Sequence, residues 1–80
     1  MREVKDNFDL ATLQKDGSGY IFNDRRDRGL VHKAACEAVG AMVTSAYKKI
    51  FLDDQAEAVT WLQAEKGQGW ENCGMCGGVE

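Results

Sequence analysis

Proline is absent from the 80 residues of the chain, and histidine occurs only once. Without proline there is no proline-rich linker to divide the chain, and 80 residues is below the usual domain size of roughly 100 to 150, so we expect a single small domain over residues 1–80. No apolar run approaches the roughly 18 residues of a transmembrane helix, and the start MREVKDNFDL lacks the apolar stretch of a signal peptide. These absences predict a cytoplasmic location and no membrane partner.

Patterns of catalysis are missing as well. The only histidine, His32, is expected inside a helix, where a pair with a cysteine would be buried away from substrate. The stretch GSG lacks the spacing and the following Lys-Ser/Thr of a phosphate-binding loop. Asp54 and Glu57 are explained by the capping of a helix rather than by acid-base chemistry. We therefore expect that the protein is not an enzyme.

Cysteine occurs three times, an odd number that fits a reducing compartment better than the even sets of secreted disulfide frameworks. The composition, with 44% hydrophobic and 29% charged residues, is that of a folded chain. A chain of this length buries only about 60% of its unfolded surface, so a metal, a staple or a partner would add stability.

The first part of the chain predicts a β-hairpin over residues 3–23. Apolar and polar residues alternate around Phe8, and residues 20–22 form a second short β-prone run. Between them, Asp16-Gly17 is typical of a tight hairpin turn, because glycine accepts the positive φ that such turns require.

The middle of the chain predicts one long helix over residues 28–50. Its apolar residues, placed at about 100° per residue, cover more than half of the helix circumference, which is typical of a central, buried helix. Residues 46–52 can either continue this helix or form a third strand, because periodicity does not distinguish the two.

A second, shorter helix is predicted over residues 54–66, with Asp54 as its N-cap and Gly67 as its end. Residues 67–80 are rich in glycine and are expected to form a tail. The expected fold class is therefore α+β: an N-terminal hairpin packed on a long central helix, then a shorter helix, then a glycine-rich tail that is either tied by a metal or free.

The histidine and the thiols define a candidate metal site. In HKAAC, His32 and Cys36 are four residues apart, which would place both on one face of the predicted helix. In CGMCGG, Cys73, Cys76 and Gly77 match the pattern C-x-x-C-G and resemble, over about six residues, the zinc knuckle of rubredoxin and zinc-ribbon proteins. The resemblance implies a turn in which backbone amides face the sulfurs. Together the four side chains would form a Cys3His set, which is typical of structural zinc.

Two other interpretations of these residues stay open. Cys36 and His32 are of types that also serve as ordinary core residues, and the tail thiols would then be free. Alternatively, Cys73 and Cys76 would form a thiol-disulfide redox pair, although glycines follow them where redox motifs place a helix N-terminus.

The net charge of -3 is unevenly distributed, with -1 in residues 1–22, +3 in residues 23–50 and -5 in residues 51–80. The last third would repel phosphates. Its acidic residues can instead bind a basic surface by imitating phosphates, and the candidates are Asp53, Asp54 and Glu57. The alternative is that these carboxylates only keep the protein dissolved.

Three arginines near the middle of the chain, Arg25, Arg26 and Arg28, can donate to the phosphates or carboxylates of an anionic partner. The alternative is a solvated loop in which Asp24 and Asp27 pair with them. Direct binding of nucleic acid is disfavoured by the negative net charge and a sequence pI near 5.1.

The favoured function is that of a small, acidic, non-catalytic protein-binding module. We expect a regulator or phage-type inhibitor that meets a nucleic-acid-handling protein through its acidic C-terminal half. One alternative is a small structural-zinc module that binds nucleic acid or another anionic partner through the three arginines. The other alternative is a thiol-disulfide redox protein that uses Cys73 and Cys76.

Overall fold

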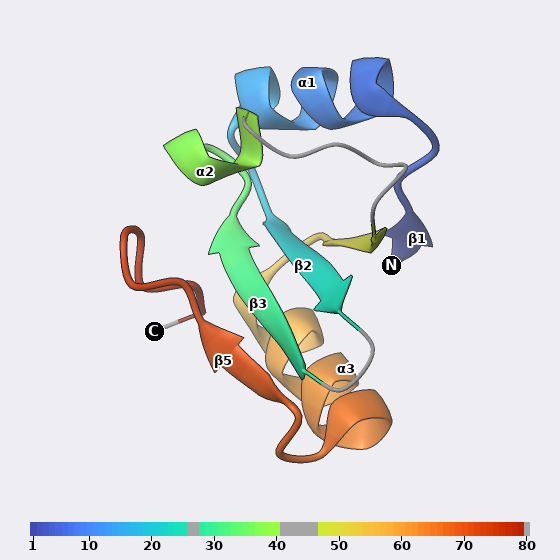
Figure 1. The fold of residues 1–80 in the computed structure, drawn as a ribbon, viewed down its shortest axis with the longest axis vertical. Helices are drawn as coiled ribbons and strands as arrows, with labels where there is room; N and C mark the ends of the chain where they lie inside the picture. Colours follow the sequence, from blue (N-terminus) through green and yellow to red (C-terminus); the bar gives the residue numbers. More distant parts are fainter. Residues whose placement is uncertain (26–27, 41–46, 80) are drawn as a thin grey trace.

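The computed structural model describes residues 1–25, 28–40 and 47–79, and these form a small α+β fold with a five-stranded sheet and three helices (Figure 1). The strand order is β1-β4-β2-β3-β5, and all neighbouring strands are antiparallel except β3 and β5, which run parallel. The predicted α+β class is thus confirmed. The strands are β1 (Arg2–Glu3), β2 (Tyr20–Arg25), β3 (Arg28–Lys33), β4 (Lys48–Leu52) and β5 (Trp70–Asn72). The helices are α1 (Asn7–Asp16), α2 (Glu37–Gly40) and α3 (Gln55–Lys66).

One face of the sheet is covered by α3, which lies behind β2 and β3 in Figure 1. Leu62 of α3 is fully buried against the sheet, and the Trp61 ring meets the Phe22 ring edge to face at 5.7 Å. We call this the α3 face. Its buried cluster consists of Phe22, Val31, Ile50, Leu52, Ala58, Leu62 and Val79.

The opposite face of the sheet, which we call the cysteine face, is covered by α1 and by the segment that carries α2. These two helices lie together at one end of the sheet (Figure 1). Because side chains alternate along a strand, Ile21 and Asn23 of β2 point to this face while Phe22 points to the other. The buried cluster of the cysteine face consists of Val4, Leu10, Ile21, Ala34, Cys36, Val39 and Cys73.

The expected hairpin over residues 3–23 is corrected by the structure, which has helix α1 in its place. Asp6 caps the start of this helix by accepting a hydrogen bond from the Asp9 backbone N–H at 2.8 Å. Gly17 ends the helix with φ 78° and donates to the Leu13 carbonyl. The positive φ of Gly17 was therefore predicted correctly, but it serves a helix end instead of a hairpin turn. The antiparallel hairpin of the fold lies one element later, between β2 and β3.

The expected long helix over residues 28–50 is also corrected. Residues 28–33 form strand β3, residues 37–40 form the short helix α2, and residues 48–52 form strand β4, while residues 41–46 lie outside the described residues. In β3, the neighbours Val31 and His32 are both buried although they point to opposite faces. A strand that is buried on both faces reads as a continuous apolar run, which resembles the pattern of a buried helix.

The expected shorter helix is present as α3. Asp54 is its N-cap and accepts a hydrogen bond from the Glu57 backbone N–H at 2.7 Å. After Gly67 the chain returns to the sheet as β5, and the tail that follows packs its last described residue, Val79, into the cluster of the α3 face. Within the described residues, no helix is long and apolar enough to cross a bilayer.

Candidate metal centre

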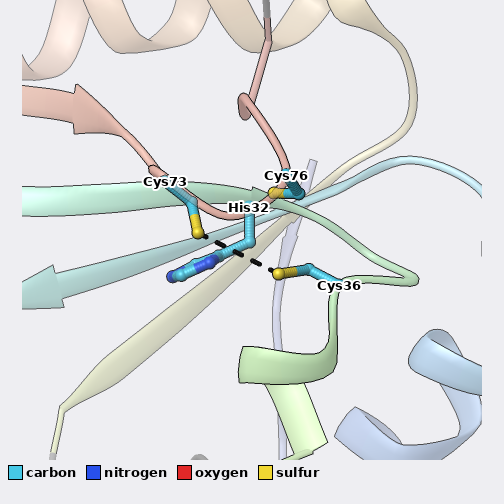
Figure 2. Close-up of side chains that lie close together, drawn as sticks. All are labelled: His32, Cys36, Cys73 and Cys76. Atoms are coloured by element: carbon cyan, nitrogen blue, oxygen red, sulfur yellow. Dashed lines mark hydrogen bonds between the residues drawn. The ribbon is translucent and has the colours of Figure 1, made fainter.

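Four side chains from three separate segments gather on the cysteine face: His32 from the end of β3, Cys36 from the turn before α2, and Cys73 and Cys76 from the tail after β5 (Figure 2). One potential ligand atom from each of them lies within 4.8 Å of the corresponding atoms of the others. His32 is 3% exposed, Cys36 7% and Cys73 6%, and Cys76 is partly buried. None of the three cysteines takes part in a disulfide. The arrangement can therefore hold a metal ion.

The parallel pairing of β3 with β5 brings the tail to the histidine. Val31 lies level with Asn72, and the next residue, Cys73, donates its backbone N–H to the Val31 carbonyl at 3.0 Å. Continued by one residue, this register places Cys73 beside His32 on the cysteine face. No sequence signal indicated this strand pairing, because β5 has only three residues and lies in a glycine-rich stretch.

A turn after β3 brings Cys36 to His32. The Cys36 backbone N–H donates to the Lys33 carbonyl at 2.9 Å, which folds the chain back over the end of the strand. The predicted proximity of His32 and Cys36 is thus present, but the predicted reason, a shared helix face, is wrong. One residue is on a strand and the other is in a turn.

Backbone N–H groups surround the sulfurs. The Met75 N–H lies 3.4 Å from Cys73 Sγ, and the Lys33 N–H lies 3.3 Å from Cys76 Sγ. Cys76 receives a further backbone N–H from Gly78, and Cys36 receives one from Ala38. Such donors stabilise thiolates, and the amides of the tail face the sulfurs as the C-x-x-C-G pattern implied.

Glycine is required in the tail beside this site. Gly78 has φ 56°, and a Cβ atom on it would lie 2.8 Å from the Val31 carbonyl oxygen. Any other residue there would be strained and would push the tail away from β3. Gly78 therefore allows the close approach that holds Cys76 over the end of the strand.

The thiols differ in acidity because their surroundings differ. Burial raises the pKa of the Cys36 thiol to about 11, against the opposing effect of the Ala38 N–H. Burial also raises the pKa of Cys76, but the N–H groups of Lys33 and Gly78 and the neighbouring thiols outweigh it, so that this pKa is lowered overall. Burial, with a smaller contribution from the Arg25 charge, lowers the pKa of His32. His32 is thus neutral near pH 7, the form in which imidazole binds metals.

The His32 ring is the part of the cluster whose polar atoms the described residues leave without hydrogen bonds. Both ring nitrogens are buried, and neither has a hydrogen-bond partner in residues 1–25, 28–40 and 47–79. An unsatisfied buried polar group costs about 1–3 kcal/mol. A neutral imidazole always carries one nitrogen with a free lone pair, which is the atom that a metal ion would bind.

The distances between the sulfurs are close to those of a zinc site. Cys36 Sγ and Cys73 Sγ are 4.0 Å apart. Two thiolates on one tetrahedral Zn²⁺, each with a Zn–S bond of about 2.3 Å, are separated by about 3.8 Å. Small side-chain movements would therefore convert the observed cluster into a tetrahedral set.

Two of the candidate arginines, Arg25 and Arg28, lie directly opposite each other at the end of the β2–β3 pair. Arg28 forms an ion pair with Glu71 of the neighbouring strand β5. The Arg25 guanidinium lies 5.9 Å from the centre of the Tyr47 ring. Arg26 and Asp27 lie outside the described residues, and Asp24 forms an ion pair with Lys66 at 2.8 Å.

The candidate acidic residues lie at the start of α3, where each has a structural contact. Asp54 caps the helix, and the carboxylates of Asp53 and Glu57 lie 3.7 Å and 2.6 Å from the amino group of Met1. Beside them, on the outer surface of α3, is a mostly apolar groove of about 570 Å³. The groove was not expected from the sequence, although its exposed small residues are spaced four apart; they are Ala56, Thr60 and Ala64.

We compared the chain with known protein families, curated proteins and solved structures. No protein family, no curated protein and no solved structure matches the chain.

Proposed function

We propose that this chain is a small zinc-binding module in which His32, Cys36, Cys73 and Cys76 hold one structural Zn²⁺. The observation that carries the proposal is the imidazole of His32, which is buried among three thiols and has no hydrogen-bond partner at either ring nitrogen within the part of the chain that the structure describes. A metal ion at this point would bind one of these nitrogens and so remove part of the cost of burying the ring.

The donor atoms favour zinc. Three thiolates and one imidazole form a soft donor set, whereas Ca²⁺ and Mg²⁺ require oxygen ligands. All four positions of the tetrahedron would be filled by the protein, which is typical of structural rather than catalytic zinc. Three thiolate charges and the +2 ion leave one net negative charge, which the backbone N–H groups at the sulfurs stabilise.

The role of the ion would be to cross-link the fold. It would join the turn after β3 to the tail after β5. The ligands Cys36 and Cys73, which it would link, are 37 residues apart in the sequence. A chain of this size has small hydrophobic cores and gains from such a link. Because the site is assembled only in the folded chain, the free energy of zinc binding contributes directly to folding.

The test is metal analysis of untagged protein purified without chelator, by native mass spectrometry before and after acid denaturation. We expect one Zn²⁺ per chain, and after exchange with Co²⁺ the absorption spectrum of a tetrahedral thiolate site. Cys76→Ser and His32→Ala should each lose the ion. Met75→Ala is the matched control, because Met75 lies between the two tail cysteines but is 70% exposed. Wild-type protein without metal, or unchanged metal content in the first two variants, overturns the proposal.

A second proposed function uses the groove on α3. It is lined by apolar residues that include Trp61 and Ala64, and by the acidic residues Asp54, Glu57 and Glu65. An apolar surface with acidic edges complements a partner protein that is apolar and basic. This supports the expectation of a protein-binding regulator or inhibitor, whose partner would be a nucleic-acid-handling protein. The arginine-based alternative has less support, because Arg28 is already paired with Glu71.

Two substitutions on α3 test the second function. Ala64→Arg would place a positive charge inside the groove at an exposed helix position, so the fold and the metal content should not change. Gln63→Arg is the control, because Gln63 is exposed on the same helix and does not line the groove. Loss of a stoichiometric protein partner in Ala64→Arg alone would support the function. Equal binding by both variants and the wild type would contradict it.

A further inference from the structure

Two buried polar groups on the cysteine face lack hydrogen-bond partners among the described residues, and they complement each other. The Asn23 side-chain oxygen, Oδ1, is a buried acceptor, and no described group donates to it. His32 has two buried ring nitrogens that are likewise unpartnered in the described part of the chain. Asn23 is 6% exposed and His32 is 3% exposed, so water does not readily replace the missing hydrogen bonds.

The strand register places these two side chains on the same face. Ile21 lies opposite His32, and Asn23 lies opposite Leu30. Asn23 follows Ile21 by two residues, so it points to the same side of the sheet as His32 and is its diagonal neighbour across the β2–β3 pair. Diagonal neighbours in an antiparallel pair lie within reach of aromatic and long side chains.

Metal binding creates the need for an acceptor at this position. When one imidazole nitrogen binds the ion, the other nitrogen carries the proton and must donate it to a hydrogen-bond acceptor. The side chains of Ile21 and Leu30 contain no acceptor. Glu71 of β5 carries a carboxylate on this side of the sheet, but it is exposed and already paired with Arg28.

We propose that Asn23 is the positioning residue of the metal centre, with its Oδ1 accepting the hydrogen bond from the His32 nitrogen that the metal leaves free. The proposal rests on the zinc site proposed above. The hydrogen bond fixes the tautomer and the orientation of the ring, so that the ring enters the metal site in the binding geometry. It also gives both buried groups the partner that they lack.

Two cationic side chains also lie near Asn23 on this face. Lys49 lies directly opposite Asn23 on β4 and is buried, and its Nζ donates to the Tyr47 carbonyl at 2.6 Å. Arg25, two residues after Asn23, is the charge that acts on both His32 and Lys49. The test therefore has to separate an effect on the histidine from an effect on this lysine.

The experiment compares Asn23→Leu, which has a similar size but no acceptor, with Asn23→Asp, which keeps one. Zn²⁺ affinity is measured by competition with a chromophoric chelator. We expect Asn23→Leu to weaken binding by about 10–100-fold, as loss of a partner of a metal-bound histidine does elsewhere, and Asn23→Asp to bind at least as tightly as the wild type. Lys49→Met is the control on the same face and should leave the affinity within about twofold, because Lys49 is not one of the four candidate ligands and its Nζ donates to the Tyr47 carbonyl.

A second readout is specific to the hydrogen bond. In the ¹⁵N NMR spectrum of zinc-loaded wild type, the free His32 nitrogen should carry a slowly exchanging proton, and in Asn23→Leu this proton should exchange fast or the tautomers should mix. This measurement on the wild type also decides the question if Asn23→Leu fails to fold.

The outcomes separate the two proposals. Wild-type protein that binds no zinc overturns both of them. Wild-type protein that binds zinc, with the same affinity in Asn23→Leu or with a rapidly exchanging His32 proton, overturns only the role of Asn23. An equal loss of affinity in Asn23→Leu and Lys49→Met also overturns it, because the effect would then be a general loosening of the cysteine face.

Discussion

The two faces of the sheet are both well buried, but by different chemistry. The buried cluster of the α3 face is entirely apolar. On the cysteine face, the buried apolar residues share the space with three polar side chains, those of Asn23, His32 and Lys49, and with the thiols. Apolar side chains require only the exclusion of water, whereas each buried polar atom also requires a partner. Packing of apolar side chains is therefore sufficient to stabilise the α3 face, whereas the cysteine face also needs a partner for its buried polar atoms.

Removal of the proposed zinc ion should have the largest effect on the difference between the two faces. Structural zinc contributes on the order of 10 kcal/mol to small zinc domains, so chelation should open the cysteine face before the α3 face. We expect amide hydrogen exchange in residues 34–40 and 72–79 to accelerate by about a hundredfold or more, and that of α3 to change far less. Equal acceleration on the two faces, or none, would contradict a metal that acts locally.

Oxidation of the protein after removal of zinc should stabilise the cysteine face through a disulfide bond. Cys36 Sγ and Cys73 Sγ are 4.0 Å apart, so an added peroxide should join them, with the two thiols losing two electrons and two protons and the peroxide becoming water. Closing a loop of this length stabilises a chain by about 4 kcal/mol in the loop-entropy model. Peptide mapping by mass spectrometry identifies the bond, and Cys76→Ser should retain it. A bond between Cys73 and Cys76 would instead favour the redox interpretation of the tail pair.

On the α3 face, Leu62→Ala should lower the free energy of unfolding by about 2–5 kcal/mol, because the side chain is fully buried. The loss should be the same in zinc-loaded and chelated protein, since the leucine and the metal centre lie on opposite sides of the sheet and distant sites act additively. Urea unfolding of both forms measures it. A loss that depends on zinc would show that the two faces are coupled.

The contrast between the faces also explains which features the sequence could predict. Helix α3 was predictable because its signals are local: Asp54 accepts from Glu57 within one turn, and Gly67 follows the last helical residue. Local signals were ambiguous at Gly17, because a glycine with positive φ is found both in hairpin turns and at helix ends, and here it ends α1. They were also ambiguous in β3, because a strand that is buried on both faces has the apolar pattern of a buried helix. In these places tertiary contacts decided the secondary structure.

The candidate site was predictable in membership but not in construction. Residue type alone selected the one histidine and the three cysteines, because few other side chains bind soft metals. Their assembly depends on the parallel pairing of β3 with the three-residue strand β5, and on the turn before Cys36. Asn23 had no sequence signal at all, because its importance comes from the cross-strand register.

The smallest expected effect is acid sensitivity at the ion pair that ties β1 to α1. The Arg2 guanidinium, with the Lys5 backbone N–H, lowers the pKa of Asp9 from 3.8 to about 2. As the pH falls from about 4 to about 2, the unfolded chain therefore takes up the Asp9 proton before the folded chain, and stability decreases.

The effect should be small because the Arg2 side chain is 45% exposed and water screens the pair. Asp9→Asn should show a smaller drop in its urea midpoint between pH 5 and pH 2.5 than the wild type, since the amide does not titrate. Release of metal in acid is common to both chains and cancels in this difference. If both chains lost the same stability over this range, the Arg2–Asp9 pair would contribute nothing to the acid sensitivity, which would then come from other titrating groups of the chain.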